Sequence, residues 1–450
     1  MPAIARGTSP ADGRGLVTIA VPKRTGHETV FRNEKASLPL TVAKLLVKVG
    51  NIGLDAVRAA LFSKTDHRQP HSILLVRFGA IGDFVVALPA LRLVRRHFST
   101  ARIVLLTAPS LNWRQSQSRT VAGGAILGDR LVDETIVVQR SALANWGRLR
   151  EIQTRIRRLN PDLCIFLPFS GEPLLRRLVK MLAVRFLGAR KNLYGYHTEA
   201  SLGFFRRAQY DAGLYDHQLT ATLRAIREVG VANEEVVFEI ETPAEDIARV
   251  EEWWNQHGLN DHEPPIAICP SSKEKVKCWP LENFRDLGLR LLEDPQLRIV
   301  LVGGNEDIQH ASFLLQAWGD RAISFAGKAS ILQTAEILRR CKLFVGVDSG
   351  PMHMAAALGR PVVGIFASVV FPVLWKPWGE QSLQIRHSVP CEFCFTTCGI
   401  CPTGTMECIR GIRVVEVLEA VQRMLPSRPR SQTPLVLPAR FPLPVPRGRS

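Results

Sequence analysis

The sequence has no apolar run of the roughly 20 residues that a membrane-spanning helix needs, and no signal-peptide pattern at its start. Cysteine is scarce, with 9 residues among 450, which excludes a disulfide-stapled scaffold. Five of these cysteines nevertheless fall between Cys391 and Cys408. We therefore expect a cytoplasmic protein without a spanning helix, in which the cysteine cluster needs its own explanation.

The net charge of +17 is concentrated at the two ends of the chain. Residues 1–70 hold 11 Lys and Arg against 5 Asp and Glu, and residues 426–450 hold 5 Arg and no acid. The remaining body is only mildly basic and shows no basic platform interleaved with aromatic residues, so we expect no nucleic-acid partner. The last 25 residues are rich in Pro and Arg, which predicts a disordered tail.

One segment of the N-terminal extension, 40–64, has apolar residues at helical spacing with Lys and Arg between them. Such a helix can lie on an anionic membrane face, which would make the protein peripheral on the inner side of the cytoplasmic membrane. It can also simply pack on the surface of the body, and we favour this second interpretation.

Short aliphatic runs alternate with helix-period stretches from residue 72 onwards, and three of these stretches predict helices over 85–97, 146–159 and 352–358. The run 72–76 is typical of a parallel strand covered on both faces, and the same alternation restarts at 265–269. It predicts an α/β protein with two Rossmann-like domains facing a central cleft. We expect an extension (1–70), a first domain (71–230), a second domain with the cysteine cluster (231–412), a helix (413–425) that packs back on the first domain, and the tail (426–450).

The loop after the first strand contains Gly79, Gly82 and Asp83 and leads into a helix. Its spacing is not GxGxxG, which disfavours a dinucleotide-dependent oxidoreductase. A carboxylate at such a helix start can accept a proton from a sugar hydroxyl as a general base. It can equally cap the helix, and the local sequence alone favours the cap.

Three polar, glycine-containing loops follow successive strands of the second domain. The first offers hydroxyl groups and lysines suited to a diphosphate, the second offers bare glycines beside Glu306, and the third offers backbone N–H groups at a helix start. Together they favour a nucleotide-diphosphate site. Its candidate residues are Ser271, Ser272, Lys277, Gly304, Glu306, Asp348, Ser349, Gly350 and His353.

These motifs resemble glycosyltransferase family 9, the ADP-heptose:lipopolysaccharide heptosyltransferases and their relatives, which have the two-domain GT-B fold. The resemblance spans about 72–425 and is carried by ILLVRFGAIGD, LPALRLVRRHF, KCWP, the Gly-Gly-Asn-Glu loop and FVGVDSGPMHMAAALGRPVVGIF. It implies that Asp83 is the general base, that Lys277 binds the donor diphosphate and that Glu306 contacts the donor nucleoside. It also implies that the Asp348-to-His353 segment holds the diphosphate and sugar.

The resemblance further implies an inverting transfer of a sugar, with a heptose from ADP-heptose as first candidate, onto a lipid-linked or lipopolysaccharide-core saccharide. No metal or other cofactor is required, because side chains and a helix start supply the positive charge. The acceptor is expected on the first domain, where basic residues accumulate, although these can also form an ordinary solvated face. Its candidate contacts are Gly82, Arg95, Arg96, Arg177 and Lys180.

Two departures from the family pattern leave alternatives open. The family usually has Ser or Thr in the first loop, where this chain has Gly79 and Ala80, and 367–370 reads Ala-Ser-Val-Val instead of a Gly-Pro-Thr-like turn. The chain can therefore be a relative that uses another nucleotide sugar, or an inactive paralogue that binds a nucleotide or glycan.

The cysteine cluster contains two Cys-x2-Cys pairs, 391/394 and 398/401, followed by Cys408. A compact metal site built on Cys391, Cys394, Cys401 and Cys408 is one interpretation. Related family members carry Cys in similar contexts, and we favour a metal-free structural knuckle beside the donor site.

Overall fold

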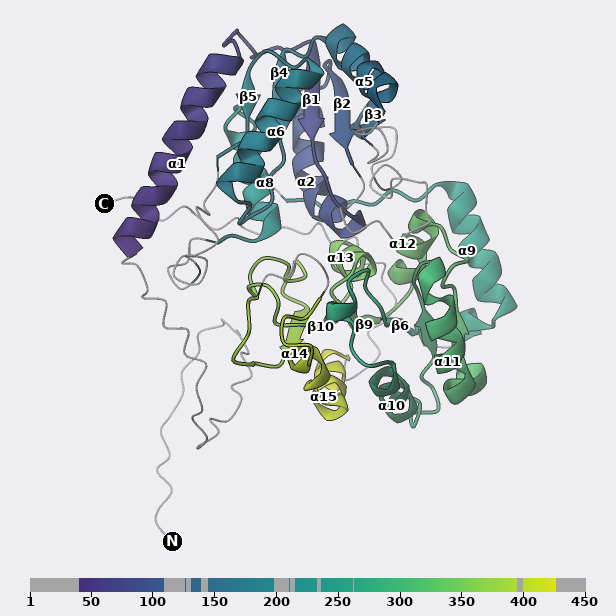
Figure 1. Ribbon diagram of the computed structural model, residues 1–450. Helices are drawn as coiled ribbons and strands as arrows, with labels where there is room; N and C mark the ends of the chain where they lie inside the picture. The colour runs from purple at the N-terminus through teal and green to yellow at the C-terminus, as the bar shows by residue number, and fades with distance from the viewer. Residues whose placement is uncertain are drawn as a thin grey trace, which may run out of the picture. The chain divides into compact units, whose positions relative to one another are not determined.

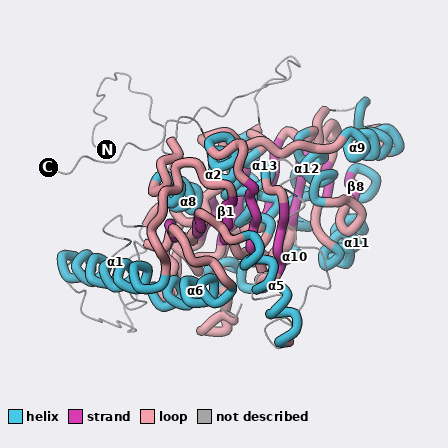
Figure 2. The backbone as a smooth tube through the Cα atoms, turned by 90° about the horizontal axis from the view of Figure 1, so that it is seen from above, coloured by secondary structure: helices cyan, strands magenta, loops and turns pink. Residues whose placement is uncertain are grey.

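The computed structural model describes residues 40–108, 126, 131–138, 145–197, 210, 215–232, 236–261, 263–394 and 400–425. The described residues form two parallel sheets with helices on their faces (Figures 1 and 2). Both sheets belong to the same compact unit. None of the helices in these ranges is long and apolar enough to cross a membrane.

The first sheet has the strand order β3-β2-β1-β4-β5, and all of its pairings are parallel. Its strands are β1 (Ser72–Val76), β2 (Arg102–Thr107), β3 (Glu134–Val137), β4 (Leu163–Phe166) and β5 (Leu193–Tyr194). The helices of this first lobe are α1 (Leu40–Leu61), α2 (Ile81–His97), α5 (Trp146–Leu159), α6 (Leu174–Leu187) and α8 (Gln218–Arg227).

The second sheet has the order β11-β10-β9-β6-β7-β8 and is also parallel throughout. Its strands are β6 (Ile266–Cys269), β7 (Ile299–Leu301), β8 (Ala322–Ser324), β9 (Leu343–Val347), β10 (Val362–Phe366) and β11 (Ser382–Arg386). The helices of this second lobe are α9 (Ala244–Gln256), α10 (Leu281–Leu291), α11 (Ile308–Trp318), α12 (Ile331–Arg339), α13 (Gly350–Ala357), α14 (Glu407–Arg410) and α15 (Val414–Met424).

The strand sequences explain why both sheets are buried on two faces. All five residues of β1 are buried, and alternate ones enter different clusters: Ile73 and Leu75 pack on the α2 side, whereas Leu74 and Val76 pack under α1, α5 and α6. A strand covered on both sides needs an uninterrupted apolar run, which is what the sequence supplies.

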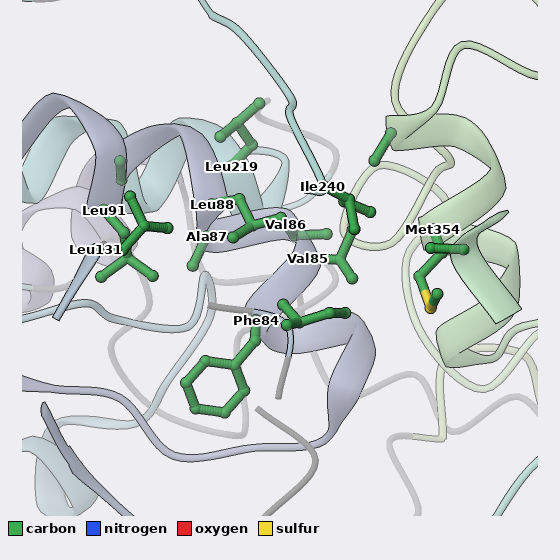
Figure 3. Close-up of a cluster of buried hydrophobic side chains, with 14 of the residues drawn as sticks. Phe84, Val85, Val86, Ala87, Leu88, Leu91, Leu131, Leu219, Ile240 and Met354 are labelled. Atoms are coloured by element: carbon green, nitrogen blue, oxygen red, sulfur yellow. The ribbon is translucent and has the colours of Figure 1, made fainter. Parts of the chain in front are cut away.

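The α2-side cluster continues from the first lobe into the second. Figure 3 shows Val85 of α2 close to Ile240 and Met354, and all three belong to one buried cluster. Helix α13, which carries Met354, contacts α2 directly. The lobes therefore meet at the helices that follow β1 and β9.

Two predictions from the sequence differ from the structure. Helix α15 packs on α10, β10 and β11 of the second lobe, so the expectation that it returns to the first domain is wrong. Helices α2 and α13 begin at Ile81 and Gly350, earlier than the apolar pattern indicated, and this places Asp83 in the first turn of α2.

Candidate functional site

Asp83 caps its own helix, as the local sequence predicted. The backbone N–H of Ala80 donates to Asp83 Oδ2 at 2.5 Å, which satisfies one of the unpaired donors of the first turn. Gly79 precedes the cap with a φ of +143°, and a Cβ built there would lie 2.3 Å from Asp83 Oδ2. The loop of this chain therefore needs glycine at 79.

Positive groups surround the Asp83 carboxyl. Burial raises its pKa above the ordinary value, and Arg77, the Ala80 N–H, His353 and Lys277 oppose that rise. Arg77 is fully buried and donates to the carbonyl oxygens of Leu167, Pro168 and Asp83, so it braces the loop. A half-buried carboxylate with a raised pKa is a stronger base than an ordinary aspartate, which suits a group that accepts a proton.

In the second lobe, Asp348 directly follows β9 and lies beside two candidate site residues, Lys277 and His353. Lys277 Nζ lies 3.1 Å from Asp348 Oδ2, and His353 Nε2 lies 3.6 Å from Asp348 Oδ1. Burial alone would raise the pKa of Asp348, but Lys277 and His353 together lower it, and Asp348 and Glu274 raise the pKa of Lys277 despite its burial. Asp348 is therefore ionised. Because it is negatively charged, it is unsuited to contact a diphosphate directly and instead positions Lys277 and His353.

The two lobes touch at glycines that belong to the candidate site. A Cβ built on Gly82 would lie 2.8 Å from His353 Cδ2, and one on Gly350 would lie 3.1 Å from Ile81 Cβ. The start of α2, which carries Asp83, thus faces the start of α13, which carries His353. The structure brings Asp83, Gly82, Lys277, Asp348, Gly350 and His353 together.

Among the described residues, no side chain caps the start of α13. Ser349 is the N-cap residue, but its side chain makes no capping bond, and its hydroxyl lies 3.8 Å from Cys269 Sγ. Unpaired N–H groups at a helix start attract anions. This arrangement is compatible with a diphosphate near Ser349 and Gly350.

Asp307, which the sequence analysis missed, organises the other donor loops. It accepts a hydrogen bond from Ser271 Oγ and one from the Gly304 N–H at 2.9 Å. Ser271 is thereby committed to Asp307, while Glu306 is exposed and folds over Gly304. The spacing Gly303-x3-Asp307 repeats Gly79-x3-Asp83 and was the signal available in the sequence.

Ser272 holds the Lys277 loop through its backbone. Its N–H donates to Cys278 Sγ at 3.3 Å, and the thiol lies 3.4 Å from the Ser272 carbonyl oxygen. These contacts close the segment between β6 and α10, so that Lys277 is fixed next to Asp348.

The basic residues predicted to bind the acceptor separate into different places. Arg95 donates to the carbonyl oxygens of Ala101 and Leu131 and pairs with Asp133, and exposed Arg96 follows it. Both lie in the last turn of α2, roughly 18 Å along the helix axis from Asp83. This corrects their placement at the site.

Arg177 is too buried to contact an acceptor, whereas the acceptor role of Lys180 stays a prediction. Arg177 is 1% exposed and donates to the carbonyl oxygens of Phe169, Gly195 and His197, so it offers no surface to a ligand. Lys180 pairs with Glu172 at 2.5 Å and lies 5.4 Å from the ring of Phe78, in the loop before Asp83.

Four cysteines of the cluster lie in the described ranges as free thiols, namely Cys391, Cys394, Cys401 and Cys408. Cys398 lies outside the described residues. Within those ranges, no three His, Cys, Asp or Glu side chains are gathered as metal ligands. Hydrogen bonds from Thr403 and the Met406 N–H lower the pKa of Cys401 to about 7.

Solved structures share this fold. A glycosyltransferase of family 9 from Veillonella parvula superposes with a TM-score of 0.59 at 18% identity, over 80% of this chain and 99% of that one. The ADP-heptose lipopolysaccharide heptosyltransferase II of Escherichia coli superposes with a TM-score of 0.53 at 19% identity, over 78% and 98%. The fold of this chain is therefore GT-B, as predicted.

Curated relatives match a shorter stretch. Lipopolysaccharide heptosyltransferase 2 of Escherichia coli K12 is 32% identical over 140 residues, which are 29% of this chain and 39% of that protein. Lipopolysaccharide heptosyltransferase 3 of the same strain is 29% identical over 130 residues, or 28% and 37%. The chain thus spans well under half the length of these relatives.

Residues 178–401 match the family model of glycosyltransferase family 9 (heptosyltransferase). This segment contains the Lys277, Glu306 and Asp348-to-His353 motifs of the resemblance, whereas its two first-lobe motifs, ILLVRFGAIGD and LPALRLVRRHF, lie outside the matched residues. The comparisons therefore confirm the resemblance to glycosyltransferase family 9, which the family match carries over residues 178–401.

Proposed function

We propose that this protein is an inverting glycosyltransferase that moves a sugar from a nucleotide-diphosphate donor onto a saccharide acceptor. ADP-heptose is the first candidate donor, and a lipopolysaccharide-core or other lipid-linked saccharide is the acceptor. The observation that carries the proposal is the contact between Gly82 and His353, because it sets the Asp83 carboxyl opposite the Lys277–Asp348 pair.

In the proposed reaction, Asp83 takes the proton of the acceptor hydroxyl while the oxygen of that hydroxyl attacks the anomeric carbon of the donor sugar. The new C–O bond forms on the face opposite the leaving diphosphate, so the configuration inverts. The bond between the anomeric carbon and the diphosphate breaks, and its electron pair leaves with the nucleotide. The raised pKa of Asp83 supports this role, because a stronger base removes the proton more readily.

On the donor side, Lys277 and the backbone N–H groups at the start of α13 would stabilise the charge on the leaving diphosphate. Asp348 keeps Lys277 in position by an ion pair, and its other carboxylate oxygen lies 3.6 Å from His353 Nε2. Because these groups supply positive charge, the proposed reaction needs no metal ion or other cofactor.

On the acceptor side, Gly82 and Lys180 remain the candidate contacts in the first lobe. A phosphorylated, lipid-linked saccharide would meet Lys180 beside Phe78, next to the Asp83 loop. Such an acceptor would be reached on the cytoplasmic face of a membrane, with the protein attached peripherally.

The test uses the full chain with a panel of nucleotide sugars: ADP-heptose, ADP-glucose, UDP-glucose, UDP-N-acetylglucosamine and GDP-mannose. The acceptor is heptose-deficient lipopolysaccharide, the product is followed by mass spectrometry, and its anomeric configuration is read by NMR. We expect a product one heptose heavier with the inverted configuration, from ADP-heptose alone.

The same panel separates the two alternatives. Transfer from another donor would identify a relative with a different sugar, for which the Ala-Ser-Val-Val turn at 367–370 is the feature to exchange. Binding of a nucleotide without release of any sugar would identify an inactive paralogue and would overturn the proposed activity.

A further inference from the structure

Three helices form the outer layer on one face of the first sheet. Side chains of α1, α5 and α6 share a buried cluster with Leu74 and Val76 of β1, so all three helices cover that same face. Helix α1 packs on α6, where Gly50 lies against Leu174 (Figures 1 and 2). The sides of these helices that point away from the sheet therefore form one surface, which we call the outer helical face.

Apolar side chains follow the outer helical face in stripes. On α1 they recur with i, i+4, i+7 spacing, and on α6 with i, i+4, i+7, i+11 spacing, which places each set along one side of its helix. Ile52 is 66% exposed and Leu175 is 70% exposed. The full set is Leu45, Val49 and Ile52 on α1, Leu175, Val179, Leu182 and Phe186 on α6, and Trp146 on α5.

This concentration is specific to one face. Of the 13 large hydrophobic residues exposed in the described ranges, 8 lie on these three helices. Trp146 and Phe186 are 6.3 Å apart between ring centroids, so the stripe of α6 continues onto α5. Grouped exposed apolar side chains, unlike scattered ones, indicate an interaction surface.

The same helices carry a large excess of positive over negative charge. Together α1, α5 and α6 contain 12 Lys and Arg residues but only 2 acidic residues. Lys44 and Lys48 flank the stripe of α1 and are exposed. Apolar stripes bordered by basic residues fit an anionic bilayer, in which apolar side chains enter the acyl boundary and cations meet the headgroups.

We propose that the outer helical face docks on an anionic lipid surface. A second copy of this chain is disfavoured as the occupant, because a symmetric contact would set the same basic helices against each other. A protein partner would usually meet a patch whose centre is depleted of charge, whereas here Lys and Arg border the apolar stripes.

The docking would also serve the proposed function, on which this step alone rests. Helix α6 begins after the carboxyl end of β4, the sheet edge from which the Asp83 loop also leaves β1. Its Lys180 lies beside Phe78 of that loop. A lipid surface held against α6 would thus present a lipid-linked acceptor at the catalytic edge.

The test is flotation of the full chain with vesicles of phosphatidylcholine and phosphatidylglycerol (70:30), compared with pure phosphatidylcholine and without donor or acceptor. We expect binding to the anionic vesicles only. The variant Val49→Asp/Leu182→Asp should lower the lipid partition by at least about tenfold. The control Leu289→Asp/Ile308→Asp alters equally exposed hydrophobic residues of the second lobe and should stay within twofold.

A second variant guards against a folding defect. Lys44→Glu/Lys48→Glu changes only exposed charges and should also lower the partition by about tenfold or more. Equal binding of all variants would overturn the proposal, as would a wild-type chain that does not float. A dimer that the aspartate variant dissolves would instead identify a second copy as the occupant. Sugar transfer to a delipidated acceptor should be unchanged in Val49→Asp/Leu182→Asp and in Lys44→Glu/Lys48→Glu. This measurement separates a loss of lipid binding from a failure of the proposed activity.

Discussion

The loops after β1 and β7 have the same local structure in two different lobes. In each, an aspartate caps the backbone N–H three residues before it: Asp83 holds Ala80, and Asp307 holds Gly304. In each, a glycine comes four residues before the aspartate, and a Cβ there would lie 2.3 Å from the carboxylate. The local sequence therefore builds the same cap twice.

The surroundings of the two carboxylates differ. Asp307 is 5% exposed and also receives the hydroxyl of Ser271, with His310 Nδ1 at 3.6 Å, so its partners lie in its own lobe. Asp83 receives only the Ala80 N–H among hydrogen bonds from described residues and senses His353 and Lys277 across the lobe contact. Burial raises both pKa values, so the position of the carboxylate, not its pKa, distinguishes a structural cap from a candidate base.

The largest expected effect comes from exchanging each aspartate for its amide. Asp83→Asn should lower kcat/KM for sugar transfer by about a thousandfold, because an amide cannot accept the proton. Its thermal melting should hardly change, since the amide oxygen still accepts the Ala80 N–H. Steady-state kinetics and calorimetry measure the two quantities.

Asp307→Asn is the matched control, since it keeps the same cap in the other lobe. Its amide can still meet both Gly304 and Ser271, so kcat/KM should stay within about tenfold of the wild type. Equal losses in the two variants would show that Asp83, like Asp307, only builds its loop.

A smaller effect is expected from the glycines. Gly79→Ala adds a Cβ where φ is +143° and Asp83 Oδ2 is 2.3 Å away, so the carboxylate must move. A displacement of about 1 Å in a reacting group can cost on the order of a hundredfold in rate, and the strained backbone about 1–3 kcal/mol in stability.

Gly303→Ala creates the same clash with Asp307 and provides the comparison. It should raise the KM for the donor through the displaced Gly304 loop while kcat falls less than in Gly79→Ala. If Gly79→Ala retained full kcat, the arrangement of Asp83 around this glycine would be irrelevant to turnover.

Much of the fold was predictable because parallel strands that are buried on both faces consist of consecutive aliphatic residues. The bounds of α5 agree with the periodicity, and β1 was predicted at its observed ends. The starts of α2 and α13 were missed because each first turn contains a glycine, Gly82 or Gly350, that the pattern assigned to a loop. For α15, an amphipathic pattern shows that one side is buried but not which sheet buries it.

The site was predictable only in part. Motif loops at strand ends must converge at one edge of a parallel sheet, so Lys277, Asp348 and His353 were found together. Charge alone could not place the arginines, because a sequence does not show which carbonyl oxygens will receive a guanidinium. Arg177 looked like a ligand contact and is instead a buried brace.

The smallest expected effect is a shift in the pH profile. Burial holds the pKa of Asp83 above its ordinary value, so kcat/KM should rise with pH as this carboxyl loses its proton. His353 lowers that pKa, and His353→Gln should therefore move the rise to higher pH, whatever it does to kcat. His310→Gln removes the corresponding imidazole beside Asp307 and should leave the position of the rise unchanged, because Asp307 takes no proton in the reaction. A shift in His310→Gln but not in His353→Gln would mean that the titrating carboxylate belongs to the second lobe, and the roles assigned to the two caps would have to be exchanged.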